Sequence, residues 1–597
     1  MKNILISHKT LFSCLGLFVT SILIIGLGGN YVVNDDWVMH IQLKMFLAGD
    51  FALQQKLDMS FILQGVAGVI WSRIFGYSFE TIRFLTLLIT ITGGVGFYKI
   101  LKLLKPAKVS NTILGATFLL MLFNPILYSS TFSYMSENYF ISILIWNTYF
   151  SLAYIKSKNV KNIYISMLLA AASVLVRQVG LLAVVNTFIA YALGSEIYNT
   201  FYTNFKKSSL SGKNLFKTLK YVPLKQLVIL LFLPLLGLGI WLAWPTYRDA
   251  EASSYVKSTI LLSVEELSGR IAKLWRIIPY FIYFTLPLTL TMGVKNKMRY
   301  FFIKAIVASF LAVNLLFPHD NFAMGNVFYV EKLYAKNYYA QNESLFDNSF
   351  FKLFISFLIS IGIINLIEIT LAERKKILNA IKKGKESLYL LFSTVFLLSF
   401  TIVSSDFYDR YLAPASLIFI LYLFSIYDDK KNVAQKYSKH LFVAVSILFV
   451  FITFALSLDD IQIKRIKWEQ AQKISEKYLV SSQIYVDDSY IKYVIENNFF
   501  ETGTHLDFSG LYRCFVDDYT IDQNIKATRM LSLLNPERPI FLKNPRIFES
   551  RKPNLPNIKK HTKEIELNKE YTSIIYNLVG KKAYVGSWCQ KDPVRVL

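Results

Sequence analysis

The chain has 597 residues, of which 54% are hydrophobic and only 18% are charged, and its formal net charge is +25. Soluble domains usually carry about a quarter charged residues, so this composition excludes an ordinary soluble protein. Apolar runs of about 18 or more residues recur through the first three quarters of the chain, and such runs predict transmembrane helices. The positive charge lies in short lysine-rich loops between these runs. We therefore expect a polytopic α-helical membrane protein whose partner is the lipid bilayer, and no nucleic acid.

Two apolar stretches near the N-terminus differ in kind. The first, residues 11–29, follows the basic residues Lys2 and Lys9 but has no clear small-residue cleavage site, so we interpret it as a retained helix rather than a signal peptide. The second, residues 59–77, is interrupted by Gln64, Arg73 and several glycines. That interruption predicts a re-entrant or interfacial helix rather than a full crossing.

Clearer membrane spans follow along the chain. They are expected at residues 81–104, 110–129, 138–155, 162–177, 179–194, 225–244, 275–294, 300–317, 350–371, 387–404, 411–427 and 440–457. Together with the first segment they give about 13 crossings. An odd number of crossings puts the two ends of the chain on opposite sides of the membrane.

Charge alternates between successive loops. Lysine and arginine gather in loops such as "KKSSLSGKNLFKTLKYVPLK" and "ERKKILNAIKKGKES", whereas "NDDW" and "PHDNFAMGN" are poor in them. The positive-inside rule places the lysine-rich loops in the cytoplasm. We therefore expect a plasma (inner) membrane protein with a cytoplasmic N-terminus and with Asp35 and Asp36 on the outer face.

The composition changes in the tail, residues 459–597. Short alternating runs, "SQIYVDD", "RPIFLKN" and "YTSIIYNLVGKKAYVG", predict strands, and "DQNIKATRMLSLL" predicts a helix. We expect a small α/β extracytoplasmic domain at 459–597 behind a transmembrane domain at 1–458. Two of the three cysteines, Cys514 and Cys589, lie in this tail. Outside the cytoplasm they can form a disulfide, and the sequence leaves open whether they are bonded or free.

Asp35 and Asp36 are the first candidates for chemistry. They stand at the expected membrane edge in "NYVVNDDWVMHIQ". Apolar surroundings and a like charge raise the pKa of a carboxyl group, which suits a general base. The alternative is helix capping, because "NDDWVMHIQLKMFLAGD" has a helical pattern and Asp favours the first turn of a helix.

Three further charged residues lie at the outer ends of expected spans. Glu137, in "SYMSENYF", can support a base, bind a divalent metal or cap a helix. Arg177, in "LVRQVG", can bind an anionic phosphate, or it can extend to the interface from a tight turn. Arg410, in "FYDRYLAP", can clamp a phosphate or anchor the chain at the interface beside tyrosines. Acids and arginines at the same face favour a site for an anionic lipid and a hydroxyl acceptor.

Metal binding remains open on the sequence. The chain has no CxxC or HExxH pattern, so a structural zinc site or zincin chemistry is not expected. A divalent ion could be held by Asp36, Glu137 and His40, although a single histidine four residues after Asp36 is more often structural. No cofactor is assigned with certainty.

The order of these motifs resembles the GT-C superfamily of membrane glycosyltransferases, in particular the protein mannosyltransferases and the bacterial lipid A aminoarabinose transferases. Those enzymes carry an acidic pair after the first helix, where this chain has "NDDW". An arginine-led second span corresponds to "FETIRFLTLLITITGGVGFYKILKLL" with Arg83, and "SYMSENYF", "LVRQVG", "FYDRYLAP" and "NFAMGNVFYVEKLY" also look like recurring family segments. The resemblance covers roughly residues 1–430. Asp36 stands where the family usually has Glu, and no WWD-type signature is present.

The resemblance implies an inverting transfer of a sugar from a polyprenyl-phosphate donor to a lipid, glycan or protein hydroxyl at the outer face. In that scheme Asp35, then Asp36, is the base, Glu137 assists it, and Arg177, Arg410 and Arg83 bind the donor phosphate. Two alternatives stay open. An outer-leaflet polysaccharide polymerase or ligase would usually show a large basic outer loop, and a lipid-linked glycan flippase or transporter would usually show internal repeats.

Overall fold

The structure is a computed structural model. It describes residues 9–33, 35–54, 60–104, 109–195, 224–245, 277–279, 281–291, 298–312, 349–372, 385–403, 409–426, 434–478, 484–485, 512–522, 564–571 and 581–591. The expected strand "RPIFLKN", the late outer loop "NFAMGNVFYVEKLY" and almost all of the expected tail helix lie outside these residues.

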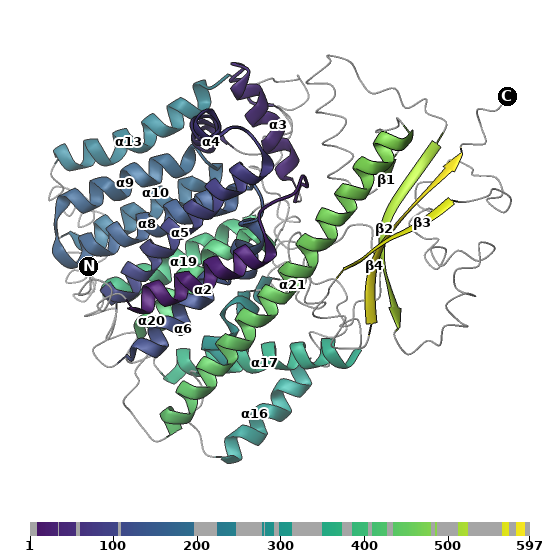
Figure 1. The fold of residues 1–597 in the computed structure, drawn as a ribbon. Coiled ribbons are helices and arrows are strands. Elements are labelled where there is room, and N and C mark those ends of the chain that lie inside the picture. The colour runs from purple at the N-terminus through teal and green to yellow at the C-terminus, as the bar shows by residue number, and fades with distance from the viewer. Residues whose placement is uncertain are drawn as a thin grey trace, which may run out of the picture.

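Helices make up the N-terminal three quarters of the described chain (Figure 1). They are α2 (Lys9–Ile25), α3 (Asp36–Leu47), α4 (Ile62–Phe75), α5 (Phe79–Leu104), α6 (Asn111–Leu122), α7 (Pro125–Ser130), α8 (Ser136–Ser157), α9 (Val160–Val174), η1 (Gln178–Gly180), α10 (Leu181–Gly194), α13 (Leu224–Ala243), α16 (Met298–Leu311), α17 (Ser349–Ala372), α19 (Lys385–Val403), η3 (Asp409–Tyr411), α20 (Leu412–Ile426) and α21 (Ala434–Tyr478). A further helix covers Phe281–Thr291.

Within the described residues, two helices, Phe79–Leu104 and Lys439–Lys473, are both long and apolar enough to cross a bilayer. The other expected spans coincide with further helices, many of them shorter than 18 residues, so the number of crossings stays a prediction. Many of these helices expose large apolar side chains: Leu17, Leu23, Ile24, Leu168, Phe232, Leu235, Leu242, Ile306, Phe310, Leu371, Val395, Ile447 and Leu448 are each more than 40% exposed. Water would disfavour so many exposed apolar side chains, which supports a lipid environment.

The expected span 110–129 is divided in two. Pro125 cannot donate a backbone hydrogen bond, and α6 ends before it at Leu122. The Asn124 side chain then caps α7, accepting from the backbone N–H groups of Ile126 (3.2 Å) and Leu127 (3.4 Å). This break turns the chain toward the loop between α7 and α8, which leads to Glu137 in the first turn of α8.

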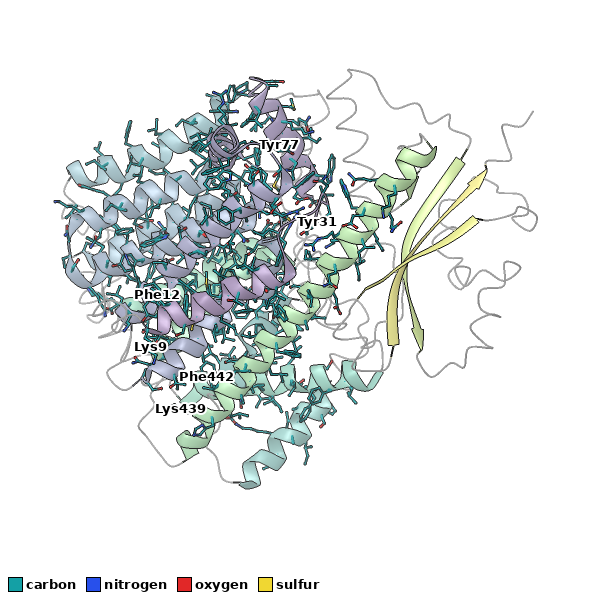
Figure 2. All side chains as sticks on the ribbon, viewed as in Figure 1. Lys9, Phe12, Tyr31, Tyr77, Lys439 and Phe442 are labelled. Atoms are coloured by element: carbon teal, nitrogen blue, oxygen red, sulfur yellow. The ribbon has the colours of Figure 1, made fainter. Side chains whose placement is uncertain are left out.

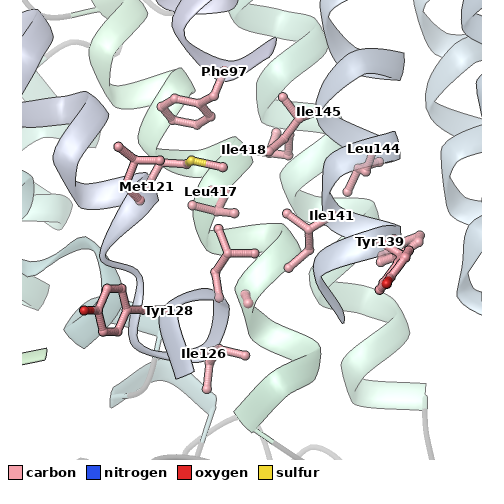
Figure 3. Close-up of a cluster of buried hydrophobic side chains, with 14 of the residues drawn as sticks. Phe97, Met121, Ile126, Tyr128, Tyr139, Ile141, Leu144, Ile145, Leu417 and Ile418 are labelled. Carbon is pink, nitrogen blue, oxygen red and sulfur yellow. The ribbon is translucent and has the colours of Figure 1, made fainter. Parts of the chain in front are cut away.

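The core joins helices that are distant in sequence. Figure 3 shows Phe97 of α5, Met121 of α6, Ile141 of α8 and Leu417 of α20 meeting in one cluster, and all four are buried. Because α20 packs among the N-terminal helices, Arg410, immediately before it, is brought to the same end of the bundle as the first loop.

Helix α21 connects the bundle to the tail. It lies between the other helices and a four-stranded sheet of β1 (Ile484–Tyr485), β2 (Tyr512–Asp522), β3 (Glu564–Tyr571) and β4 (Lys581–Lys591) (Figure 1). The sheet order is β1-β2-β4-β3, with β1 and β2 parallel and the other pairs antiparallel. The helix runs without interruption through the expected boundary at 458 and ends at Tyr478.

The two tail cysteines are paired with each other on neighbouring strands of the sheet. Cys514 of β2 pairs in register with Cys589 of β4. The expected strand "SQIYVDD" contains β1, and "YTSIIYNLVGKKAYVG" contains the end of β3 and the start of β4. The sequence pattern did not predict β2 or most of β3.

Candidate active site

The first loop begins with a glycine turn. Helix α2 ends at Ile25, and Gly26 adopts φ +83°, with its N–H donating to the Ile22 carbonyl (2.8 Å). A left-handed residue just after a helix is most easily a glycine. Figure 2 shows Lys9, at the start of α2, and Tyr31, in this loop, at opposite ends of the bundle. The loop therefore leaves the bundle at the end nearer the sheet.

Asp35 occupies the N-cap position of α3, but its side chain makes no capping hydrogen bond. Instead, Arg410 Nη1 donates to Asp35 Oδ2 over 3.0 Å. The Asp35 side chain is 48% exposed. Asp35 is therefore a partly exposed carboxylate that is held by a buried arginine. Helix capping does not explain why this position has an aspartate.

Asp36 has a different environment. It is fully buried, and the backbone N–H groups of Val33 (2.7 Å) and Tyr134 (3.4 Å) donate to its two carboxyl oxygens. Burial raises the pKa of Asp36 to about 7, although Arg83 and the two amides oppose that rise. The residue thus joins the first loop to the loop between α7 and α8, and its carboxyl group is closed off from solvent.

Glu137 and the two arginines complete a charge cluster with Asp35. Arg177 Nη1 lies 2.6 Å from Glu137 Oε1, and Arg410 Nε lies 3.6 Å from the same oxygen. All three side chains are buried: Arg177 is 10% exposed, Arg410 9% and Glu137 2%. The guanidinium carbons of both arginines lie within 6 Å of the Tyr411 ring centre, at 5.5 and 5.7 Å.

The cluster has two carboxylates and two guanidinium groups, so its formal charges cancel. Burial alone would raise the pKa of Glu137, but the adjacent Arg177 and Arg410 lower that pKa below its ordinary value. Glu137 Oε2 is buried and has no hydrogen-bond partner among the described residues. Most buried polar atoms have a hydrogen-bond partner, so this oxygen leaves part of the cluster's hydrogen-bonding capacity unused.

A tight turn presents Arg177. Its backbone is extended (φ −148°), and it precedes η1 between α9 and α10. The turn closes when Ser173 Oγ donates to the Gly180 carbonyl (3.1 Å). A Cβ atom on Gly180 would lie 2.3 Å from the Ser173 backbone carbon, so only glycine fits this close approach.

Tyr134 connects α4 to the loop between α7 and α8. Its hydroxyl donates to the Gln64 carbonyl (2.8 Å), and Gln64 Nε2 donates to the Tyr134 carbonyl (2.6 Å). A Cβ on Gly68 would lie 2.2 Å from the Tyr134 hydroxyl. The sequence pattern did not predict this role; its only signal was a tyrosine three residues before Glu137.

His40 lies apart from the charge cluster. Its Nδ1 is 3.2 Å from the Tyr77 hydroxyl, and its ring packs against Phe79 with ring centres 4.3 Å apart. Burial, with Arg83 and Lys44, lowers the pKa of His40 well below its ordinary value. Among the described residues, no three His, Cys, Asp or Glu side chains are grouped to hold a metal ion. The suggested set of Asp36, Glu137 and His40 is therefore not assembled in this structure.

Arg83 is also outside the cluster. It is fully buried and donates to the carbonyl oxygens of Leu27 (2.8 Å), Gly29 (2.7 Å) and Tyr31. Its guanidinium carbon stands 3.6 Å from the Tyr31 ring centre. The donor groups of Arg83 thus bind the backbone of the first loop. The charge cluster itself comes from four separate segments, which contribute Asp35, Glu137, Arg177 and Arg410.

No protein-family model and no curated protein matches the chain. Among solved structures, ArnT from Cupriavidus metallidurans bound to undecaprenyl phosphate aligns with 11% identity and a TM-score of 0.43, covering 87% of this chain and 94% of that one. The apo form of the same protein aligns with 12% identity and a TM-score of 0.38 over the same shares.

Proposed function

We propose that the chain is an inverting glycosyltransferase that moves a sugar from a polyprenyl-phosphate donor to a hydroxyl acceptor at the outer face of the membrane. The observation that carries the proposal is the cluster of Asp35, Glu137, Arg177 and Arg410 at one end of an apolar helical bundle. Charged side chains that are buried in a membrane protein are costly and usually functional, and Glu137, Arg177 and Arg410 are buried here. The order of the sequence motifs supports the same class of enzyme.

In the proposed reaction the acceptor oxygen attacks the anomeric carbon on the face opposite the phosphate. The bond between that carbon and the phosphate oxygen breaks, its electron pair leaves with the lipid phosphate, and the acceptor proton passes to Asp35. This role suits Asp35 because its side chain is 48% exposed, whereas Asp36 is buried with both oxygens accepting from backbone amides. Only Asp35 can meet a substrate without a rearrangement of the loop.

Arg177 and Arg410 stabilise the departing phosphate. Guanidinium groups bind phosphate oxygens in pairs, and stabilising charge that develops in the transition state is a large catalytic term. Before the donor binds, the two arginines are neutralised by Asp35 and Glu137. When a phosphate binds to Arg410, it competes with Asp35 for the guanidinium group. Donor binding would thereby release the Asp35 carboxylate to act as a base.

Transport without chemistry is the main competing function. A flippase needs polar groups along its path near the bilayer midplane, whereas the charged cluster here lies at the ends of helices: Glu137 begins α8, and Arg410 precedes α20. A polysaccharide polymerase or ligase uses the same kind of donor. It would differ in the acceptor, which would be another glycan.

The test is cleavage of the donor. The purified protein in lipid nanodiscs would be given a polyprenyl-phosphate-linked sugar and a membrane extract as the source of acceptor, and the free polyprenyl phosphate would be measured. We expect its release to depend on the acceptor, with inverted configuration at the transferred sugar. Movement of intact donor across proteoliposome membranes without cleavage would contradict the proposal and favour transport.

A further inference from the structure

The first loop is held by two arginines from distant parts of the chain. We infer that Arg83 and Arg465 are positioning residues that together fix the backbone between Ile25 and Tyr31 and so fix the location of Asp35. The inference rests on the proposed function for its catalytic meaning. The contacts themselves are independent of that function.

Arg83 holds the inner side of the loop from α5. Its guanidinium group donates to the carbonyl oxygens of Leu27, Gly29 and Tyr31, and it stacks on the Tyr31 ring. The side chain is fully buried. A guanidinium group can serve three carbonyls because its five N–H donors point in fixed directions.

Arg465 holds the beginning of the loop from α21. Its Nη2 donates to the carbonyl oxygens of Ile25 (3.2 Å) and Gly26 (3.0 Å). Its aliphatic stem packs against Gly29, where a Cβ atom would lie 3.0 Å from Arg465 Cγ, and Gly29 has φ +100°. The glycines therefore provide both the left-handed backbone and the space for the arginine.

We call Arg83 and Arg465 together the clamp. Contacts of this kind are needed because the segment that they hold is intrinsically flexible. Residues 26–29 read Gly-Leu-Gly-Gly, and glycine loses more conformational freedom on ordering than any other residue. The last carbonyl groups of α2 have no partners within that helix and carry its partial negative charge, which cations stabilise. The two arginines donate to five carbonyl groups, one at the end of α2 (Ile25) and four in the loop that follows it (Gly26, Leu27, Gly29 and Tyr31).

Arg465 also connects the loop to the tail. It lies in α21 beyond the expected span 440–457, where Trp468, three residues further along, meets Phe79 of α5 with ring centres 6.1 Å apart. The same helix continues to Tyr478. One helix therefore contacts the loop that leads to Asp35 and also leads into the tail.

The experiment compares three single variants of the full chain in nanodiscs: Arg465→Gln, Arg465→Lys and the control Lys473→Gln. Lys473 is an exposed cation on the same helix. Hydrogen exchange of the amides of residues 26–33 would be measured beside steady-state transfer. We expect Arg465→Gln to speed exchange of this segment by about tenfold or more and to lower kcat with little change in KM for the donor. Arg465→Lys should restore part of both, and Lys473→Gln should match the wild type.

Two results would overturn the inference. Unchanged exchange in Arg465→Gln would show that the arginine does not hold the loop. Faster exchange with an unchanged kcat would show that holding the loop does not position the base. A wild-type chain that transfers no sugar would instead overturn the proposed function and the catalytic meaning of the clamp, and the exchange rates would still decide whether the clamp holds the loop.

Discussion

At the level of single residues, Glu137 depends on its arginine partners. Its side chain is 2% exposed and lies 2.6 Å from Arg177. Removing one member of a buried ion pair typically costs about 3–5 kcal/mol, because the other charge is left without compensation. We therefore expect Arg177→Gln to lower the thermal unfolding temperature in detergent clearly, and Arg177→Gln combined with Glu137→Gln to restore most of it. Equal stability of the single and double variants would contradict this pairing.

The same double variant separates binding from folding. Because it keeps the fold but lacks a phosphate-binding guanidinium group, its affinity for polyprenyl phosphate should be lower than that of the wild type. Arg73→Gln removes an exposed arginine from α4 and serves as the control. Equal affinity in all three proteins would exclude Arg177 from the donor site.

Asp36 gives a pH dependence with a definite sign. Its pKa is about 7 in the folded protein against an ordinary value of 3.8. The folded state therefore binds the proton more tightly, so the contribution of Asp36 to stability is greatest below pH 4 and is lost as the pH rises toward 7. We expect Asp36→Asn to become more stable relative to the wild type as the pH rises from about 4 to about 7, by on the order of 1 kcal/mol per pH unit at most, and to keep a constant advantage above that range. Parallel stability curves for the two proteins would contradict the assignment.

At the level of elements, the turn between α9 and α10 sets the position of Arg177. A Cβ at Gly180 would overlap the Ser173 backbone, and forced overpacking typically costs about 1–3 kcal/mol. Gly180→Ala should therefore lower the unfolding temperature and weaken donor binding together. Gly239→Ala, in α13 where a Cβ meets nothing within 4 Å, is the matched control. Loss of stability in the control alone would contradict the account of this turn.

Hydrophobic patterns predicted most helices, because a long apolar run can satisfy its backbone in lipid only as a helix. The pattern also predicted the helix beginning at Asp35–Asp36. It could not separate the roles of these two neighbours, since the difference depends on Arg410, which is 375 residues away from Asp35. Nor could it show that Arg83 binds backbone carbonyls, because any arginine at a membrane edge has the same local sequence signal.

At the level of the whole molecule, the sidedness of the tail can be tested through its cysteines. Cys514 and Cys589 are directly opposed across β2 and β4, and opposed residues of antiparallel strands have Cα atoms about 4.5–5.5 Å apart, within the range of a disulfide. Such bonds persist outside the cytoplasm. We expect non-reducing peptide mapping of membranes, alkylated before lysis, to recover the linked pair. Full alkylation of both thiols would indicate a cytoplasmic tail and would contradict the expected topology.

The charge cluster is built from four segments that are far apart in the sequence, so no single segment contains the whole site. Asp35, Glu137, Arg177 and Arg410 come from the first loop, the start of α8, the turn after α9 and the turn before α20. The alternation of lysine-rich and lysine-poor loops predicted that these segments share one face of the membrane. These residues come into contact because α20 packs against the N-terminal helices. A single sequence does not show which helices pack together, so it could not predict these contacts.

The central claim is that Asp35 accepts the proton of the acceptor hydroxyl, and Asp35→Asn tests it most directly. Asparagine preserves the size of the side chain and one acceptor for Arg410, and the Asp35 side chain makes no capping hydrogen bond that the change could remove. Positioned acid–base groups typically contribute about 10²–10⁴-fold in rate. We therefore predict that sugar transfer from a polyprenyl-phosphate donor falls by that factor while thermal stability is kept. Asp50→Asn, whose side chain accepts from the Ala52 amide, is the control and should remain near the wild type. Wild-type turnover by Asp35→Asn would contradict the account.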